Sequence, residues 1–448
     1  MNGVLDPIKG FCGELIGPDH EAYDTARRVH NGLIDKRPAL IARCSGVADV
    51  VDALALGRRH GLPIAIRGGG HNVAGRATVD AGIVIDLSPM KGVHVDPRAR
   101  TARAQAGLTW AGFNRETQAH CLATTGGVVS TTGIAGLTLG GGIGWLMGRC
   151  GLTVDNLESV ELVTADGQIL TASAQEHEDL FWALRGGGGN FGVATSFTYR
   201  LHPIGPEITG GIVAHPVARA QEVLRLYREA TAGAPDDLTM FAGLIHGPDG
   251  SKLAAIVCCH CGSLAEGRSA TASIKRFGPP VLDTIGTMSY CDVNTILDAA
   301  YPRGAFNYWK SSYLAGLSDE AIAAAVQCFE RTPSPMSGIL FEHVHGSAAR
   351  VDPAATAFPH RRGGYNMLVL SQWMDMDGTE AGIAWGRDAY AALQPFAAAG
   401  RYVNYLGDED AAAVESAFGP NYARLRSVKA RYDPENVFRL NQNIPPAA

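Results

Sequence analysis

A run of three glycines followed by a histidine places the strongest constraint on this chain. Residues 67–75 read Arg-Gly-Gly-Gly-His-Asn-Val-Ala-Gly and directly follow the apolar residues 62–66. Consecutive glycines permit a backbone path closed to residues with a Cβ atom, and they let N–H groups approach an anion closely. An imidazole at the rim of such a loop can bind a metal, transfer a proton or bond covalently to a cofactor. A surface turn with a capping histidine is the alternative.

Glycine is also dense at residues 126–151 and 186–192, and the chain holds 55 glycines in 448 residues. Cradling phosphate is a natural use of such loops. None of them matches the dinucleotide fingerprint in its required strand–loop–helix setting. Residues 140–144 can be fitted to its glycine spacing, but they lack the preceding buried strand. The Gly-Lys-Ser/Thr of a nucleoside-triphosphate loop is absent from the sequence as well. These exclusions favour a pyrophosphate cofactor held by scattered amides, and a covalent bond at His71 would indicate a flavin.

The bulk properties indicate an ordinary soluble globular protein of two domains rather than a nucleic-acid or membrane binder. A chain of 448 residues is longer than a single hydrophobic core usually supports. The net charge is −6, and the sequence has no run of basic residues. Residues 1–17 lack the features of a signal peptide, and no apolar run approaches the ~20 residues of a membrane span. Nine cysteines at scattered spacings do not form a disulfide framework. We therefore expect a cytoplasmic protein.

The sequence Cys258-Cys259-His260-Cys261 superficially suggests a metal site. It continues an apolar run typical of a buried strand, in which neighbouring side chains point to opposite faces. Adjacent residues cannot then easily share one tetrahedral ion, and no second pair has zinc-like spacing. We interpret these residues as buried thiols and expect no metal site.

The hydrophobic pattern predicts an α+β protein. An Asp166-Gly167 pair predicts a hairpin turn between residues 161–165 and 168–170. Glycine thins from about residue 208, where longer alternating strands predict a second domain with an antiparallel sheet. Strands are expected at 38–43, 64–67, 83–87, 93–95, 101–105, 212–215, 238–244 and 367–373, and helices at 24–32, 47–60, 179–184, 217–232 and 319–331.

Several segments together carry a family resemblance. Gly69-Gly70-His71-Asn72, Gly151-Leu152 with Asp155-Asn156, and the stretches at 132–157, 179–195, 402–405 and 441–444 resemble FAD-linked oxidases of the vanillyl-alcohol oxidase superfamily. Within it, the berberine bridge enzyme-like branch is the most similar, in particular the bacterial members that include 6-hydroxy-D-nicotine oxidase and mitomycin radical oxidase. The resemblance spans nearly the whole chain and is weakest in its middle.

The resemblance implies a two-lobed fold of the PCMH type with a discontinuous FAD-binding domain. That domain would comprise residues 1–205, with a core at about 34–205, and a berberine bridge-like segment at 401–448 that returns to it. Residues 206–400 would form a substrate domain whose antiparallel sheet covers the flavin ring.

The resemblance further implies that His71 is bonded to the 8α carbon of FAD. A neutral imidazole is a competent nucleophile for this bond; non-covalent FAD packed against His71 is the alternative. Doubly linked relatives carry a cysteine where this chain has Val129, so we expect no second, cysteinyl link and regard Cys121 and Cys150 as structural. The implied cofactor-binding residues are Arg67, Gly68, Gly69, Gly70, His71, Asn72, Gly75, Val129, Thr132, Gly133, Gly136, Gly140, Gly141, Gly144, Val193, Asn404, Asn441 and Gln442.

The catalytic candidates also follow from the resemblance. The Tyr402-Val403-Asn404-Tyr405 segment matches a family strand on which a tyrosine serves as base, and we favour Tyr405 over Tyr402. Strand alternation would place these two tyrosines on opposite faces unless the strand bends. The alternative to a base, for either tyrosine, is a packed aromatic residue whose hydroxyl bonds to the backbone.

Two further catalytic candidates lie in the expected second-domain sheet. Lys310 lies in a Trp-Lys-Ser strand near the substrate of relatives, although a solvated surface lysine is an equal alternative. Gln372 occupies a position that often faces the flavin. His343 and His345 alternate with Phe341 on one strand face and could line the pocket, or could be structural.

The resemblance to this family implies an FAD-dependent oxidase. It would move a hydride from a small organic substrate to flavin N5 and then to oxygen, which gives hydrogen peroxide. The resemblance places Thr132 at a position that lies beside flavin C4a in relatives, where a small side chain would leave room for oxygen. The alternative is a drug- or metabolite-binding resistance protein on the same scaffold, which sequesters or reoxidises a reduced quinone-like compound. We expect a small molecule and oxygen as partners, no nucleic acid or membrane, and a single chain or a homodimer.

Overall fold

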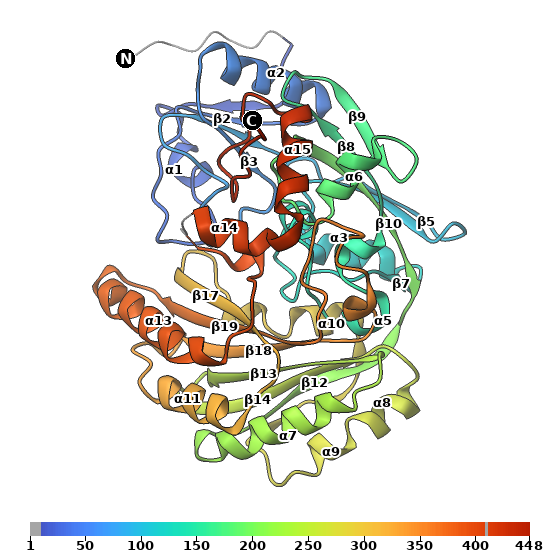
Figure 1. The fold of residues 1–448 in the computed structure, drawn as a ribbon, viewed down its shortest axis with the longest axis vertical. Coiled ribbons are helices and arrows are strands. Elements are labelled where there is room, and N and C mark those ends of the chain that lie inside the picture. The colour runs from blue at the N-terminus through green and yellow to red at the C-terminus, as the bar shows by residue number, and fades with distance from the viewer. Residues whose placement is uncertain (1–9, 408–410) are drawn as a thin grey trace.

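A computed structural model describes residues 10–407 and 411–448 and shows two lobes (Figure 1). Residues 1–9, part of the expected FAD-binding domain and of the segment tested for a signal peptide, lie outside the described residues. No helix in the described ranges is long and apolar enough to cross a membrane.

A four-stranded sheet opens the first lobe, in the order β1-β2-β4-β3. β2 and β3 both pair with β4 in parallel, and β1 pairs with β2 antiparallel. Helix α2 connects β2 to β3 and packs against β4, as a parallel crossover requires. The bounds are β1 Glu14–Ile16, α1 Tyr23–Ala26, β2 Leu40–Arg43, α2 Val47–Arg59, β3 Ile64–Arg67 and β4 Ile83–Asp86.

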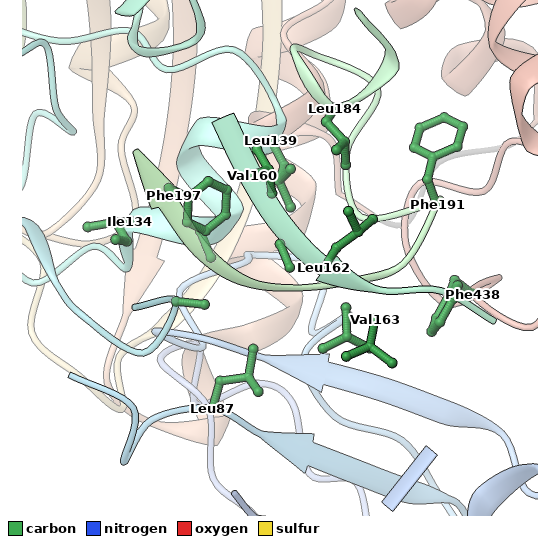
Figure 2. Close-up of a cluster of buried hydrophobic side chains, with 14 of the residues drawn as sticks. Leu87, Ile134, Leu139, Val160, Leu162, Val163, Leu184, Phe191, Phe197 and Phe438 are labelled. Atoms are coloured by element: carbon green, nitrogen blue, oxygen red, sulfur yellow. The ribbon is translucent and has the colours of Figure 1, made fainter. Parts of the chain in front are cut away.

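A five-stranded antiparallel sheet in the order β5-β6-β10-β8-β9 completes the first lobe. Gly167 has φ +86° in the tight turn between β8 and β9, which confirms the predicted hairpin. Figure 2 shows the apolar core that β8, β10 and α4 share, including Val160, Phe197 and Leu139. The bounds are β5 Val93–Asp96, β6 Thr101–Gln105, α3 Trp110–Gln118, β7 Leu122–Ala123, α4 Ile134–Leu139, α5 Met147–Cys150, β8 Leu157–Val163, β9 Ile169–Ser173, α6 Glu178–Leu184, β10 Val193–Arg200 and β11 His202–Pro203.

The second lobe is built on an eight-stranded antiparallel sheet in the order β15-β12-β14-β13-β18-β19-β17, with β16 paired to β12. Its long strands cross the middle of Figure 1. The strands are β12 Glu207–Pro216, β13 Leu238–His246, β14 Lys252–His260, β15 Leu282–Asp283, β16 Gly286–Ser289, β17 Phe306–Leu314, β18 Gly338–Val344 and β19 Gly364–Trp373.

Helices cover the face of this sheet that is turned away from the first lobe (Figure 1). Along β19, Met367 and Val369 join the core beneath these helices, whereas Leu368 and Leu370 belong to a cluster with Val73 of the first lobe. Strand alternation therefore leaves an apolar face towards the first lobe. The helices of this lobe are α7 Ala220–Ala232, α8 Leu264–Ala270, α9 Ala272–Lys275, α10 Tyr290–Thr295, α11 Asp319–Glu330, α12 Ser347–Arg350 and α13 Thr379–Leu393.

The chain returns to the first lobe at its end (Figure 1). Leu425 and Val428 of α15, with Phe438 and Ile444 beyond it, belong to the first-lobe core. The last elements are the 3-10 turn η6 Val403–Tyr405, α14 Ala411–Phe418 and α15 Tyr422–Tyr432.

Two sequence-based predictions of local structure were wrong. The helix expected at 24–32 is the single turn α1, after which the His30 amide donates to the Gly70 carbonyl oxygen (2.9 Å). This tertiary hydrogen bond to the glycine loop takes the place of an intrahelical hydrogen bond. Residues 403–405 form a 3-10 turn rather than a strand.

The thiols at 258–261 are buried, as expected, where β14 ends. Cys258 belongs to the core under the helices, whereas Cys259 and Cys261 belong to the cluster on the opposite face of the sheet. Neighbouring side chains of this strand thus point in opposite directions.

Candidate functional site

A cavity lies between the two lobes, and all three glycine-rich regions line it. The first region contributes Gly68, Gly69 and Gly70, and the third contributes Gly188 to Asn190. The second contributes Val129, Thr132, Gly133 and Gly136, among others. The sheet of the second lobe and the segment 402–405 line the remaining sides.

Two of these glycine loops touch each other backbone to backbone. A Cβ atom on Gly69 would lie 2.6 Å from the Gly133 Cα, and one on Gly133 would lie 2.5 Å from the Gly69 nitrogen. Gly70 has φ +68°, a conformation that favours glycine. Glycine is therefore required here so that the loops can close one side of the cavity.

His71 lines the cavity at the end of the first glycine loop. Its ring stacks on the buried His30 ring at a centroid distance of 3.8 Å, and the Thr131 hydroxyl lies 3.5 Å from its Nε2. Burial, with a smaller effect of His30, lowers the pKa of His71 to about 3. The imidazole is therefore neutral at physiological pH and keeps a lone pair for bonding.

The cavity residues fit the FAD that the resemblance implies. Gln442 donates through Nε2 to the Leu406 carbonyl oxygen (3.1 Å), whereas its buried Oε1 has no hydrogen-bond partner among the described residues. That oxygen can accept a hydrogen bond from a cofactor. Asn441 donates to the Gly189 carbonyl oxygen (2.7 Å) and shapes the third glycine loop.

Among the described residues that line the cavity, Glu342 is the one with a carboxyl side chain, and the sequence analysis missed it. This buried residue of β18 faces the cavity; its Oε1 accepts from the Tyr405 hydroxyl (2.8 Å) and its Oε2 from Asn366 Nδ2 (2.6 Å). Burial raises the pKa of Glu342 to about 7, and the two hydrogen bonds limit the rise. A carboxyl that titrates near neutrality can accept a substrate proton.

The two candidate tyrosines both line the cavity, but their hydroxyls differ. Because a 3-10 turn brings residues i and i+3 to one side, Tyr402 and Tyr405 lie together, with ring centroids 4.9 Å apart, instead of on opposite strand faces. The Tyr402 oxygen accepts from the amides of Gly142 (3.1 Å) and Ile143 (3.2 Å) and from Asn404 Nδ2 (2.9 Å). The Tyr402 hydroxyl thus bonds to the backbone, which the sequence analysis gave as the alternative to the role of base.

Tyr405 is poorly suited to the role of base that the sequence analysis favoured. Burial and the neighbouring Glu342 raise the pKa of its phenol well above 10. The phenol instead donates its proton in the hydrogen bond to Glu342. The geometry thus makes Glu342 a better candidate for the base than Tyr405.

Lys310 and the two strand histidines are not at the cavity. Lys310 lies on the helix-covered face of the sheet, where its ammonium is 5.5 Å from the Tyr308 ring and 6.0 Å from the Tyr390 ring of α13. His343 shares the face of Phe341, which is packed in the helix-side core, and stacks on His345 at 4.5 Å. Of the two alternatives left open for these histidines, the structure is consistent with the structural one, because Leu340 and Glu342, on the opposite face of β18, line the cavity.

Gln372 shares the face of Leu368 but lies beyond the cavity. It pairs in register with Asn307 near the end of β19. The two polar atoms of its buried side-chain amide have no hydrogen-bond partner among the described residues. Arg67 is likewise behind the site, because it bonds to Asp86 (2.7 Å) and to the Ala26 carbonyl oxygen (2.7 Å).

The remaining predicted residues divide into two groups. Four glycines lie behind the lining and permit close packing, because a Cβ atom on any of them would collide with a neighbouring group. Gly75 lies against Ile34, Gly140 against the Asn404 side-chain amide, Gly141 against Phe358, and Gly144 against the Gly126 carbonyl oxygen. Val193 is buried beside Ala194, which lines the cavity. The predicted residues that the structure brings together around the cavity are Gly68, Gly69, Gly70, His71, Asn72, Val129, Thr132, Gly133, Gly136, Tyr402, Asn404, Tyr405, Asn441 and Gln442.

Comparison with protein families finds two matches. Residues 38–173 match the FAD binding domain family, and residues 401–445 match the family described as berberine and berberine like. Both matched segments contribute to the cavity.

Comparison with individual proteins finds relatives of nearly the same length. The chain is 32% identical to (R)-6-hydroxynicotine oxidase of Paenarthrobacter nicotinovorans, over 100% of this chain and 99% of that one. It is 31% identical to an FAD-linked oxidoreductase of Dictyostelium discoideum, over 99% and 98%. The crystal structure of 6-hydroxy-D-nicotine oxidase from Arthrobacter nicotinovorans superposes with a TM-score of 0.91 at 30% identity, over 99% of this chain and 100% of that one.

Proposed function

The chain belongs to the berberine bridge enzyme-like family of FAD-linked oxidoreductases, and we propose that it is an oxidase for a small organic substrate. Bound FAD would accept a hydride from a substrate carbon and pass the electrons to oxygen, which gives hydrogen peroxide. The observation that carries the proposal is Glu342, an acid with a pKa near neutrality on the cavity wall formed by the second-lobe sheet.

Glu342 removes the proton from the substrate's N–H or O–H group. Tyr405 and Asn366 each donate a hydrogen bond to its carboxylate, so both oxygens are held in place. Tyr405 is thus a positioning residue for this acid. The apolar wall around Glu342 excludes water and keeps its pKa raised.

The glycine loops and the C-terminal segment hold FAD, and we propose that His71 is bonded to its 8α carbon. His71 would supply the bonding nitrogen; formation of the link would release two hydrogens in all, one of them from the imidazole N–H, and oxygen would accept both as hydrogen peroxide. The neutral state of His71 supports this bond. Val129 lines the cavity at the position of the second link in doubly linked relatives, and valine offers no thiol.

The test combines anaerobic flavin reduction with peroxide release. A candidate compound should bleach the flavin without oxygen, and air should restore the colour with about one hydrogen peroxide per flavin. Glu342→Gln should retain FAD but slow bleaching by ~10²–10⁴-fold, the usual value of general base catalysis. An unchanged rate in Glu342→Gln would contradict the role of Glu342.

The same test addresses a drug- or metabolite-binding protein on this scaffold. Compounds would then shift the flavin spectrum without bleaching it, or a reduced quinone would be reoxidised without a C–H bond being broken. That outcome would overturn the oxidase proposal.

A further inference from the structure

The ring of His30 packs against His71 from outside the cavity. The two rings stack with a centroid distance of 3.8 Å and an angle of 20° between their planes. Among the described residues, His71 belongs to the cavity lining and His30 does not. His30 therefore covers a face of the His71 ring and leaves the cavity in front of His71 open to a cofactor.

The backbone of His30 is held by both lobes. Its amide donates to the Gly70 carbonyl oxygen (2.9 Å), directly before His71, and its carbonyl oxygen accepts from the Gly304 amide of the second lobe (2.9 Å). The residue is also buried, with 8% of its surface exposed. The ring cannot withdraw from His71 unless these hydrogen bonds break, so it offers a rigid surface.

The glycine loop itself gives the His71 ring little support. The three residues before it are glycines and carry no side chains. Its ring nitrogen Nε2 lies 3.5 Å from the Thr131 hydroxyl, a distance too long for a strong hydrogen bond. An imidazole turns about two single bonds, and formation of a bond to a cofactor requires one orientation about both. The stack on His30 supplies that restraint.

The geometry of the stack indicates a contact between ring faces rather than proton transfer. The N–H bond of an imidazole lies in the plane of its ring, so two nearly parallel stacked rings do not direct N–H groups at each other's lone pairs. The buried Nε2 atom of His30 has no hydrogen-bond partner among the described residues. Burial, with the nearby charge of Arg303, lowers the pKa of His30 to about 4. His30 thus presents a flat, neutral ring to His71.

We propose that His30 is a positioning residue for the covalent attachment of FAD, because its stacked ring holds the His71 imidazole in the orientation from which the bond forms. The inference rests on the proposed link, in which the imidazole gives up its N–H hydrogen, a second hydrogen is released, and oxygen accepts both as hydrogen peroxide. It assigns His30 no part in the oxidation of substrate. Since small displacements of a reacting group slow a reaction by up to about a hundredfold, loss of the stack should slow attachment by on the order of tenfold to a hundredfold.

Two substitutions distinguish the flat ring from its bulk and from its nitrogens. His30→Phe keeps a flat ring without nitrogens, whereas His30→Leu fills the space with a side chain that is not planar. Each full-length chain is produced under riboflavin limitation and mixed with FAD in air, and its intact mass is followed over time after denaturation. We expect His30→Phe to gain the linked mass at about the wild-type rate. His30→Leu should gain it at least about tenfold more slowly, while it still binds FAD that acid precipitation releases.

His215→Leu is the matched control for the loss of a buried histidine ring. His215 is buried and contacts the Phe277 ring edge-on at a centroid distance of 5.3 Å. Like His30, it is not one of the described residues that line the cavity. The variant should link FAD at the wild-type rate even where its thermal stability falls.

Three results would overturn the inference. Attachment at the wild-type rate in His30→Leu would show that the flat ring is not needed. Slow attachment in His30→Phe would assign the role to the imidazole nitrogens, and a folded His30→Leu chain that binds no FAD would assign the ring to cofactor binding.

Failure of the proposed function gives different results. A wild-type chain that never gains the linked mass would contradict the proposed link and this inference with it. A linked flavin that no compound bleaches would contradict the oxidase and leave the role of His30 intact.

Discussion

Glu342 shows how one residue acquires its chemistry from the surroundings. An ordinary glutamate titrates near 4.5, whereas burial on the cavity wall raises the pKa of Glu342 to about 7. Glu342 lies in a strand in which successive side chains point to opposite faces of the sheet. This alternation alone does not say which of the two faces lines the cavity. The sequence analysis left the role of the histidines on the face of Phe341 open and did not consider Glu342 on the other face of the strand.

The raised pKa of Glu342 predicts a pH-dependent contribution to stability. The folded chain binds this proton more tightly than the unfolded chain, so the stabilisation is complete below about pH 4.5 and is lost as the pH rises through 7. Glu342→Gln should therefore gain stability relative to wild type between pH 5 and pH 8, by at most about 3 kcal/mol at 1.36 kcal/mol per pKa unit. Thermal unfolding of both proteins at the two pH values measures this. A difference that does not change with pH would refute the raised pKa.

The two tyrosines predict an order of effects on flavin reduction. Tyr405→Phe removes a hydrogen bond to Glu342 without removing the base, so it should slow reduction by about tenfold and shift the pH profile. Tyr402→Phe leaves the amides of Gly142 and Ile143 and the Asn404 side chain without their acceptor, so it should lower thermal stability and FAD retention. Stopped-flow reduction and thermal unfolding distinguish the two. A loss in Tyr405→Phe as large as that in Glu342→Gln would restore Tyr405 as a base.

At the scale of elements, regular structure was predictable where local signals suffice. The Asp166-Gly167 hairpin and the strands at 64–67 and 238–244 follow from turn chemistry and alternation. The segments at 27–32 and 403–405 did not follow the local pattern. Their backbone and side chains bond to the glycine loops, as His30 does to Gly70, and such distant partners are invisible in a local pattern.

The contact between the first two glycine loops gives a prediction for an element. Gly69→Ala would place its Cβ atom 2.6 Å from the Gly133 backbone, so the loops must separate. We expect lower thermal stability and loss of most bound FAD, measured by the ratio of flavin to protein absorbance. Gly316→Ala, which would meet nothing within 4 Å, is the control and should match wild type. Full FAD occupancy in Gly69→Ala would show that the loop contact does not shape the site.

At the scale of the whole molecule, the cavity exists only because distant parts of the chain meet. Glycines from residues 68–70, the sheet face of Glu342 and the tail residue Gln442 line one space. The motif in the first glycine loop was sufficient to place residues 68–72 at the cavity, although Arg67 and Gly75 of the same motif lie behind it. Lys310 and Gln372 were misplaced because their position depends on how the two lobes face each other, which no single motif records.

The intact mass of the denatured chain tests most directly the claim that this cavity is an FAD site centred on His71. Wild-type protein should exceed its apo mass by one FAD less two hydrogens, keep its yellow colour in an acid-precipitated pellet, and yield one flavin-bearing peptide, which contains His71 and no cysteine. His71→Ala should show the apo mass and release any flavin into the supernatant. An apo mass for the wild-type chain, or flavin on a cysteine peptide, would contradict the account.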